Sequence, residues 1–160
     1  VCREGNFTSF PGLYGWFFRN CNTLPLSSNV GTMKKFLSAV KTLLARNEKI
    51  LIYPEQGMWW NYRKPRPTEP GAYKIAAMNK VPIIPLFITM NDSELIGGDG
   101  FPIQEYTIHI LPAIFPKEDA GVKENCEFLK EENYRVCKEV YEKVYGIPLV
   151  YDGKNYTDVK

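Results

Sequence analysis

The sequence predicts an α/β fold with a largely parallel, mixed sheet and helices packed on both of its faces. Two apolar segments, 49–53 and 81–89, have the composition of buried strands, and a loop and a helical segment over 71–79 separate them. The order strand, crossover, helix, strand is typical of a βαβ unit, whose strands run parallel. A chain of 160 residues fits one domain. We therefore expect a single domain over 1–150 and a polar tail over 151–160.

Three further segments carry patterns that predict regular structure. A helix is indicated where apolar residues recur at helical spacing before Asn47: Met33, Phe36, Leu37, Val40, Leu43 and Leu44. A Gly-rich turn over 96–100 precedes a strand over 104–111, in which apolar and polar residues alternate. A long charged helix is expected over 123–145, with inward candidates Phe128, Val136, Val140 and Val144.

Composition argues against several classes of site. The net charge is only +2, which does not favour a nucleic-acid partner. No apolar run reaches the ~20 residues that a membrane-spanning helix needs. The four cysteines (Cys2, Cys21, Cys126, Cys137) lack the paired spacing of metal ligands, and only one histidine could join them. We expect free thiols and no metal site.

The most informative segment follows the first buried strand. There Pro54, Glu55, Gln56 and Gly57 form a turn at the point where open α/β sheets bind ligands, and glycine permits backbone angles closed to other residues. The Glu55 carboxylate could accept hydrogen bonds from substrate hydroxyls or fix a basic group that grips phosphate. The alternative is a solvated glutamate in an ordinary strand-to-loop turn.

Basic and aromatic residues accompany this turn. Arg63, Lys64 and Arg66 could supply positive charge to an anionic ligand, or they could form a solvated surface patch. Two aromatic runs, 16–18 and 59–60, have the character of membrane-interface anchors, although such residues are also ordinary core.

These segments together resemble the glycerolipid acyltransferases, the family of lysophosphatidate acyltransferases. The Pro54-Glu55 pair is similar to the family's third block, and the Val-Pro-Ile-Ile-Pro-Leu run over 81–86 is similar to its fourth. A Pro-Gly-Ala helix start at 70–72 fits the family pattern between them. The resemblance covers about residues 1–90. The chain departs from the family where Gln56 replaces a glycine and Met58 an arginine, and where Ser27-Ser28 stands for Asp-Arg.

The resemblance implies an activity and its partners. Family members transfer a fatty acyl group from acyl-CoA or acyl carrier protein to a lysophospholipid hydroxyl, as in the conversion of lysophosphatidate to phosphatidate. It implies no further cofactor, a peripheral position on the cytoplasmic face of a membrane, and substrate contacts from Pro54, Glu55, Gln56 and Gly57. Arg63 and Lys64 are its candidate phosphate contacts.

The catalytic pair of this family is not found in the chain. The family's first block is His-x-x-x-x-Asp, in which His acts as general base. The one histidine, His109, comes after the other blocks and has Ile114, not Asp, five residues on. We therefore expect the N-terminal part of the fold to be absent, no catalytic residue to lie in this chain, and the chain alone to be inactive.

Two other interpretations stay open. The chain could belong to a non-catalytic lipid-binding or membrane-associated relative, which the missing arginines favour a little. An unrelated nucleotide-binding domain has less support, because the sequence contains no Gly-x-Gly-x-x-Gly and no Walker-type loop.

Overall fold

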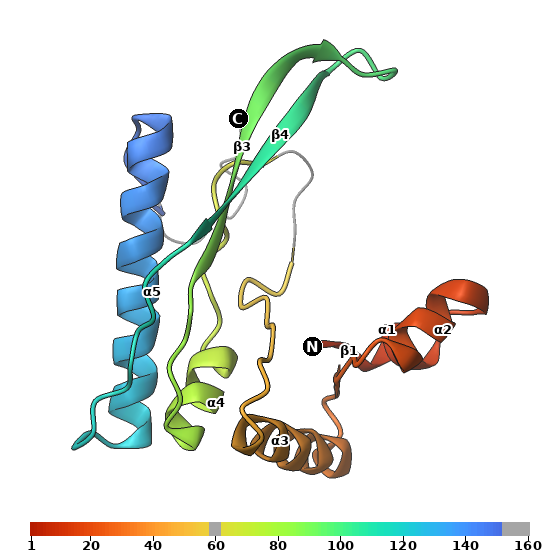
Figure 1. The fold of residues 1–160 in the computed structure, drawn as a ribbon, viewed down its shortest axis with the longest axis vertical. Helices are drawn as coiled ribbons and strands as arrows, with labels where there is room; N and C mark the ends of the chain where they lie inside the picture. Colours follow the sequence, from red (N-terminus) through yellow and green to blue (C-terminus); the bar gives the residue numbers. More distant parts are fainter. Residues whose placement is uncertain (58–61, 152–160) are drawn as a thin grey trace. The chain divides into compact units, whose positions relative to one another are not determined.

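The structure, a computed structural model, describes residues 1–57 and 62–151. The chain divides into two compact units, Val1–Tyr53 and Pro54–Lys160, and each is described by itself. The described residues contain five helices and two two-stranded sheets (Figure 1). The single domain over 1–150 stays a prediction, and the expected tail lies outside the described residues apart from Tyr151.

The first unit contains a small parallel β-α-β arrangement. Strand β1 (Cys2–Arg3) pairs in parallel with β2 (Pro25–Leu26), and the helices α1 (Glu4–Thr8) and α2 (Gly12–Asn20) form the connection between them. The predicted helix is α3 (Val30–Ala45), and two of the six apolar residues that predict it, Phe36 and Val40, are buried. Its first turn is capped by the Asn29 side chain, which accepts a hydrogen bond from the Thr32 N–H at 3.1 Å.

The second unit has two helices at the expected places. Helix α4 (Gly71–Asn79) has the predicted bounds, and α5 (Val122–Tyr145) begins one residue before the predicted start. They pack against each other through a core that comprises Tyr73, Ala76, Ala77 and Leu129. The inward face of α5 is shifted from the prediction: Asn125, Leu129 and Tyr141 are buried, whereas Val144 is exposed.

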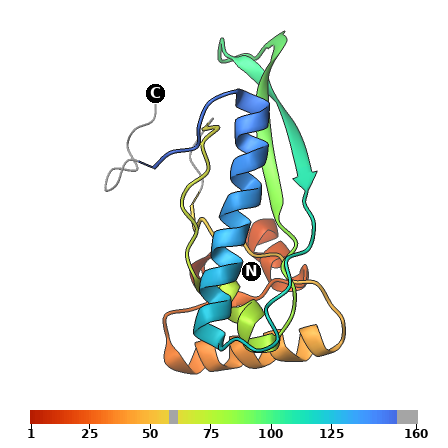
Figure 2. The ribbon, with the colours of Figure 1, turned by 90° about the vertical axis from the view of Figure 1, so that its left-hand side faces the viewer.

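A long antiparallel hairpin lies beside α5 (Figure 2). Strand β3 (Leu86–Ile96) pairs with β4 (Pro102–Ile110), so that Leu86 lies opposite Ile110 and Met90 opposite Tyr106. The Gly-rich turn is where the sequence predicts it: Gly97 N–H donates to the Phe101 carbonyl at 2.8 Å, and Gly100 adopts φ +83°.

The expected large parallel sheet is wrong, and prolines explain much of the difference. Pro82 and Pro85 have no N–H to give to a ladder, so the segment before Leu86 contributes an isolated bridge between Ile83 and Ile114 and one hydrogen bond from the Leu111 N–H to the Pro85 carbonyl. The strand predicted over 81–89 therefore starts at Leu86. The short turn after it permits only antiparallel pairing. The segment 49–53 is not assigned as a strand.

The hairpin also corrects the expectation of helices on both sheet faces. One face packs Phe87 against Tyr141 of α5 and against Leu149. On the other face the apolar residues of the predicted alternation are solvent-exposed, with Tyr106 at 64%, Ile108 at 62% and Ile110 at 74%. Within the described part of this unit, helix packing therefore covers one face of the hairpin.

The α4–α5 core yields a stability prediction. Leu129 is completely buried, so Leu129→Ala should lower the free energy of unfolding by about 2–5 kcal/mol, as cavity-forming leucine substitutions do. Urea unfolding followed by circular dichroism measures the change. Leu95→Ala at the exposed end of β3 is the matched control, expected within about 0.5 kcal/mol of the original chain. Equal losses in the two variants would contradict the core assignment.

Candidate functional site

The turn over Pro54–Gly57 is attached by two hydrogen bonds to a loop that follows it. Glu55 Oε2 accepts the backbone N–H of Arg66 at 2.9 Å. The Pro54 carbonyl accepts the backbone N–H of Glu69, also at 2.9 Å. Because both donors are main-chain groups, the loop is positioned by its backbone. The Glu55 carboxylate therefore binds the main chain of this loop, and its contact with a substrate hydroxyl or with a phosphate-binding side chain stays a prediction.

The two residues after Glu55 differ in why they suit the turn. The left-handed backbone falls on Gln56, with φ +55°, and not on Gly57, so the expected use of the glycine's conformational freedom is corrected. What Gly57 provides is space. A Cβ added at Gly57 would collide with Nη1 of Arg66, so the guanidinium lies directly against this glycine. Glu55, Gly57 and Arg66 thus form one cluster.

Tyrosine side chains from distant segments also hold the loop that carries Arg66. The Tyr151 hydroxyl donates to the Pro65 carbonyl at 2.8 Å. The Tyr73 hydroxyl on α4 donates to Thr68 Oγ1 at 2.9 Å and accepts from the Asn133 side chain of α5, also at 2.9 Å. The loop that carries Arg66 is therefore fixed by α4, α5 and the segment after α5.

Burial sets the electrostatics of this region. Burial raises the pKa of Glu55, while the Arg66 N–H and the Arg66 guanidinium oppose the shift. Burial also raises the pKa of Tyr73 to about 12 and that of Cys137 to about 12, and the charge of Glu55 adds to both shifts. The carboxylate is the acidic group of a largely desolvated cluster, where its attraction to a guanidinium is strongest.

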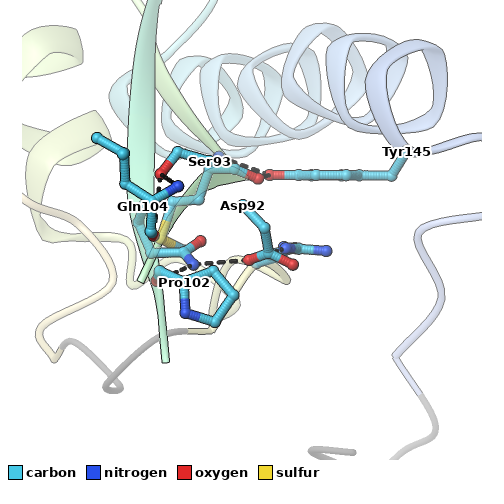
Figure 3. A network of polar contacts seen from close by, with 8 residues as sticks. Asp92, Ser93, Pro102, Gln104 and Tyr145 are labelled. Atoms are coloured by element: carbon cyan, nitrogen blue, oxygen red, sulfur yellow. Dashed lines mark hydrogen bonds and ion pairs between the residues drawn. The ribbon is translucent and has the colours of Figure 1, made fainter. Parts of the chain in front are cut away.

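The two basic residues expected as phosphate contacts have partners on the protein. Arg63 Nη2 lies 2.7 Å from Asp92 Oδ1, and its guanidinium lies 6.0 Å from the Tyr145 ring centre. Hydrogen bonds from Gln104 and Arg63 lower the pKa of Asp92. Figure 3 shows this network. In it the Tyr145 hydroxyl also accepts a hydrogen bond from the Met90 N–H and donates one to the Met90 carbonyl. Lys64 Nζ lies 5.1 Å from the Tyr151 ring centre.

The remaining candidates are not members of this cluster. His109 Nε2 is 2.9 Å from the hydroxyl of Thr89, a buried residue of the hairpin. This places the histidine in a strand, as the sequence predicts. Trp16 and Phe17 are exposed on α2 and Phe18 is half-buried, while Trp59 and Trp60 lie outside the described residues. All four cysteines are free thiols.

Sequence reasoning missed the residues that hold the loop. Tyr73, Asn133 and Tyr151 act from positions far along the chain, and no local pattern links them to Glu55. Arg66 was named only as one of three basic residues. The sequence contains one signal that singles out Arg66 among them. Arg66 stands between Pro65 and Pro67, and these prolines restrict the backbone from which its side chain extends.

The raised pKa of Glu55 gives a pH prediction. An acid whose pKa is higher in the folded than in the unfolded chain adds stability at low pH, which is lost as the pH rises through the folded value. Glu55→Gln keeps an acceptor for the Arg66 N–H and removes the charge. The variant should therefore match the original chain at low pH and be the more stable of the two above the pKa of Glu55, as measured by thermal unfolding across pH.

The control for this prediction is Glu69→Gln, which removes an exposed carboxylate from the same loop. If Glu55→Gln were the less stable protein at neutral pH, the attraction between the Glu55 charge and Arg66 would outweigh the cost of desolvating the carboxylate, and the predicted direction of the stability change would be wrong.

No helix among the described residues combines the length and apolar character that crossing a bilayer requires.

Comparison with known proteins identifies one family. The family model described as Acyltransferase matches residues 5–89, which is more than half of the chain and agrees with the extent of the resemblance seen in the sequence. No curated protein and no solved structure matches the chain. The matched residues include the Glu55 turn, the Arg66 loop and α4. This chain therefore belongs to the acyltransferase family.

Proposed function

We propose that the parent protein transfers a fatty acyl group from acyl-CoA or acyl carrier protein to the hydroxyl of a lysophospholipid, converting lysophosphatidate to phosphatidate. In this proposal the present chain forms the acceptor side of the site. The observation that carries it is the placing of the Arg66 guanidinium against Gly57, in a loop whose main chain the Glu55 carboxylate binds, within the residues that match the family.

The chemistry of the acceptor explains why such a cluster is useful. A phosphate monoester needs a cation with several donors in a fixed geometry, and guanidinium provides this better than ammonium. Positions 27, 28 and 58 carry serine, serine and methionine. Ser27 is buried and its hydroxyl donates to Glu4, so that position serves packing. In this proposal the Arg66 guanidinium takes the place of the arginines that family members carry at positions 28 and 58.

The other substrate contacts proposed are Pro54, Glu55, Gln56 and Gly57, with Arg63 and Lys64 nearby in sequence. The ion pair of Arg63 with Asp92 is solvent-exposed, and exposed pairs contribute only ~0–1 kcal/mol. A phosphate group could therefore compete for Arg63 at small cost. Arg66 would be the fixed contact, and Arg63 and Lys64 the adaptable ones.

A lipid acceptor also implies a place in the cell. We propose a peripheral position for the parent enzyme on the cytoplasmic face of a membrane, where lysophospholipid and a soluble acyl thioester meet. This interpretation requires no cofactor beyond the acyl donor itself.

The acceptor proposal predicts a binding difference that this chain can test. Arg66→Ala should weaken lysophosphatidate binding about 10- to 100-fold, the loss expected for hydrogen bonds to a charged group. Titration calorimetry below the critical micelle concentration measures it. Monoacylglycerol with the same acyl chain lacks the phosphate, and its weaker binding should be insensitive to Arg66.

Arg135→Ala is the matched control, because it removes an arginine whose ion pairs with Glu132 and Glu139 lie on the surface of α5. If Arg66→Ala and Arg135→Ala bound lysophosphatidate equally well, Arg66 would not be the phosphate contact.

The absence of the family's His-x-x-x-x-Asp block from the sequence predicts that these 160 residues do not catalyse the transfer. His109 is engaged with Thr89 in a strand and is not followed by the family's aspartate. With acyl-CoA and lysophosphatidate, phosphatidate formation should equal that of a protein-free control. Mass spectrometry is the suitable assay, because the four free cysteines would react with thiol reagents. Formation above that control would show a base elsewhere in the chain.

A non-catalytic lipid-binding domain is the alternative, and it is favoured by Ser28 and Met58, which stand where the family carries arginines. Acyl transfer by the parent protein separates the two functions. A parent that binds lysophosphatidate and never acylates it would support the lipid-binding domain and exclude the enzyme.

A further inference from the structure

The charge of this chain is divided unevenly between its two units. Residues 1–53 contain seven Lys and Arg against two Asp and Glu, a net charge of +5, whereas residues 54–160 contain 13 against 16, a net charge of −3. The whole-chain value of +2 hides this division. All seven basic side chains of the first unit are solvent-exposed. One of its two acids, Glu4, accepts a hydrogen bond from the buried Ser27.

Helix α2 in the same unit exposes an apolar and aromatic surface, here called the α2 aromatic surface. Its residues are solvent-exposed by 44–72%: Phe10, Leu13, Tyr14, Trp16 and Phe17. Such a group of neighbouring large apolar side chains is unusual on a soluble protein and marks an interaction site.

The packing of α2 explains why these residues face outward. The helix uses its opposite side, Gly15 and Arg19, to contact the segment before it. Gly15 is buried, and an added Cβ would collide with the Phe10 carbonyl. Arg19 Nη1 donates to the Phe7 carbonyl at 3.3 Å. Within this unit the aromatic side is left without a covering element.

The rings also pack against one another. Phe10 stacks on Phe18 with centres 5.7 Å apart, and Trp16 meets Phe17 edge to face at 5.4 Å. These contacts reduce the conformational freedom that the side chains would lose on docking, because part of that ordering is already present.

We propose that the α2 aromatic surface is the part of the chain that docks on an anionic lipid bilayer. Tryptophan, tyrosine and phenylalanine partition into the interfacial region of a bilayer. Anionic head groups attract the exposed basic side chains that this unit carries in excess. An uncharged apolar partner would satisfy the aromatic residues alone, and a nucleic acid would satisfy chiefly the charge. This proposal deepens the proposed function, on which it rests for the presence of a lipid acceptor.

The first experiment is flotation of the complete 160-residue chain with vesicles. Vesicles of equal parts phosphatidylglycerol and phosphatidylcholine should carry the chain upward, and pure phosphatidylcholine vesicles should carry much less. Raising the salt concentration should release it, because screening weakens the attraction. Equal binding to both vesicle types, or no binding, would overturn the proposal without any variant.

Variants then locate the surface. Trp16→Ser with Phe17→Ser should weaken binding about tenfold or more, and Lys34→Glu with Lys35→Glu should do the same through charge. Matched controls come from the second unit, where Phe101 and Phe115 are 65% and 66% exposed, against 54% for Trp16 and 48% for Phe17, and where Lys74 and Lys123 are exposed lysines. Phe101→Ser with Phe115→Ser, and Lys74→Glu with Lys123→Glu, should bind much as the original chain does.

Fluorescence reports whether α2 itself enters the interface. The chain has three tryptophans, so Trp59→Phe with Trp60→Phe leaves Trp16 alone, and its emission should shift to the blue with anionic vesicles. An unshifted emission on bound vesicles, loss of binding only in the second-unit variants, or tighter binding to duplex DNA than to vesicles would each overturn the proposal. These readouts involve no acyl transfer or lysophosphatidate, so their failure is separable from that of the proposed function.

Discussion

The hydrogen bond from the Arg66 main chain to the Glu55 carboxylate is the contact on which the rest of the candidate site depends. It joins a turn to a loop eleven residues further on, and the loop has no helix or strand of its own in its described part. Irregular segments hold a shape only when side chains or neighbouring elements satisfy their backbone groups. Here Glu55 accepts the Arg66 N–H and the Tyr151 hydroxyl donates to the Pro65 carbonyl, while Tyr73 holds the loop through the side chain of Thr68.

Elements defined by local periodicity were predictable from the sequence. The bounds of α4 and α5 follow from apolar spacing and from glycine and proline at their ends, and the turn at 97–100 follows from its glycines. The sheet was not predictable in the same way. Which strands pair is decided by long-range contacts, and two prolines within an otherwise strand-like apolar run move the start of β3 to Leu86. The alternation in β4 indicates a strand but not which face is covered.

The same distinction between local and long-range contacts applies to the candidate site. The Pro-Glu turn could be found from sequence because its residues are contiguous. The role of Gly57 could not, because a close approach by Arg66 is a property of two separated segments. Nor could the partners of Arg63 and Lys64, since Asp92, Tyr145 and Tyr151 come from the hairpin and from the end of the chain. Residue type shows which chemistry a segment can perform, and tertiary contacts decide which side chains lie together in the site.

The difference between the two arginines follows from how each is held. Arg63 is paired on the surface with Asp92, where water screens the pair and the side chain keeps much of its freedom. Arg66 is fixed by its backbone between two prolines, its main-chain N–H donates to a Glu55 carboxylate whose pKa is raised by burial, and its guanidinium lies against Gly57. Keeping that carboxylate in a desolvated position opposes stability. A residue retained against stability is more readily explained by what it positions than by what it contributes to folding. On this argument Glu55 serves to present Arg66, and the turn serves to leave room for it.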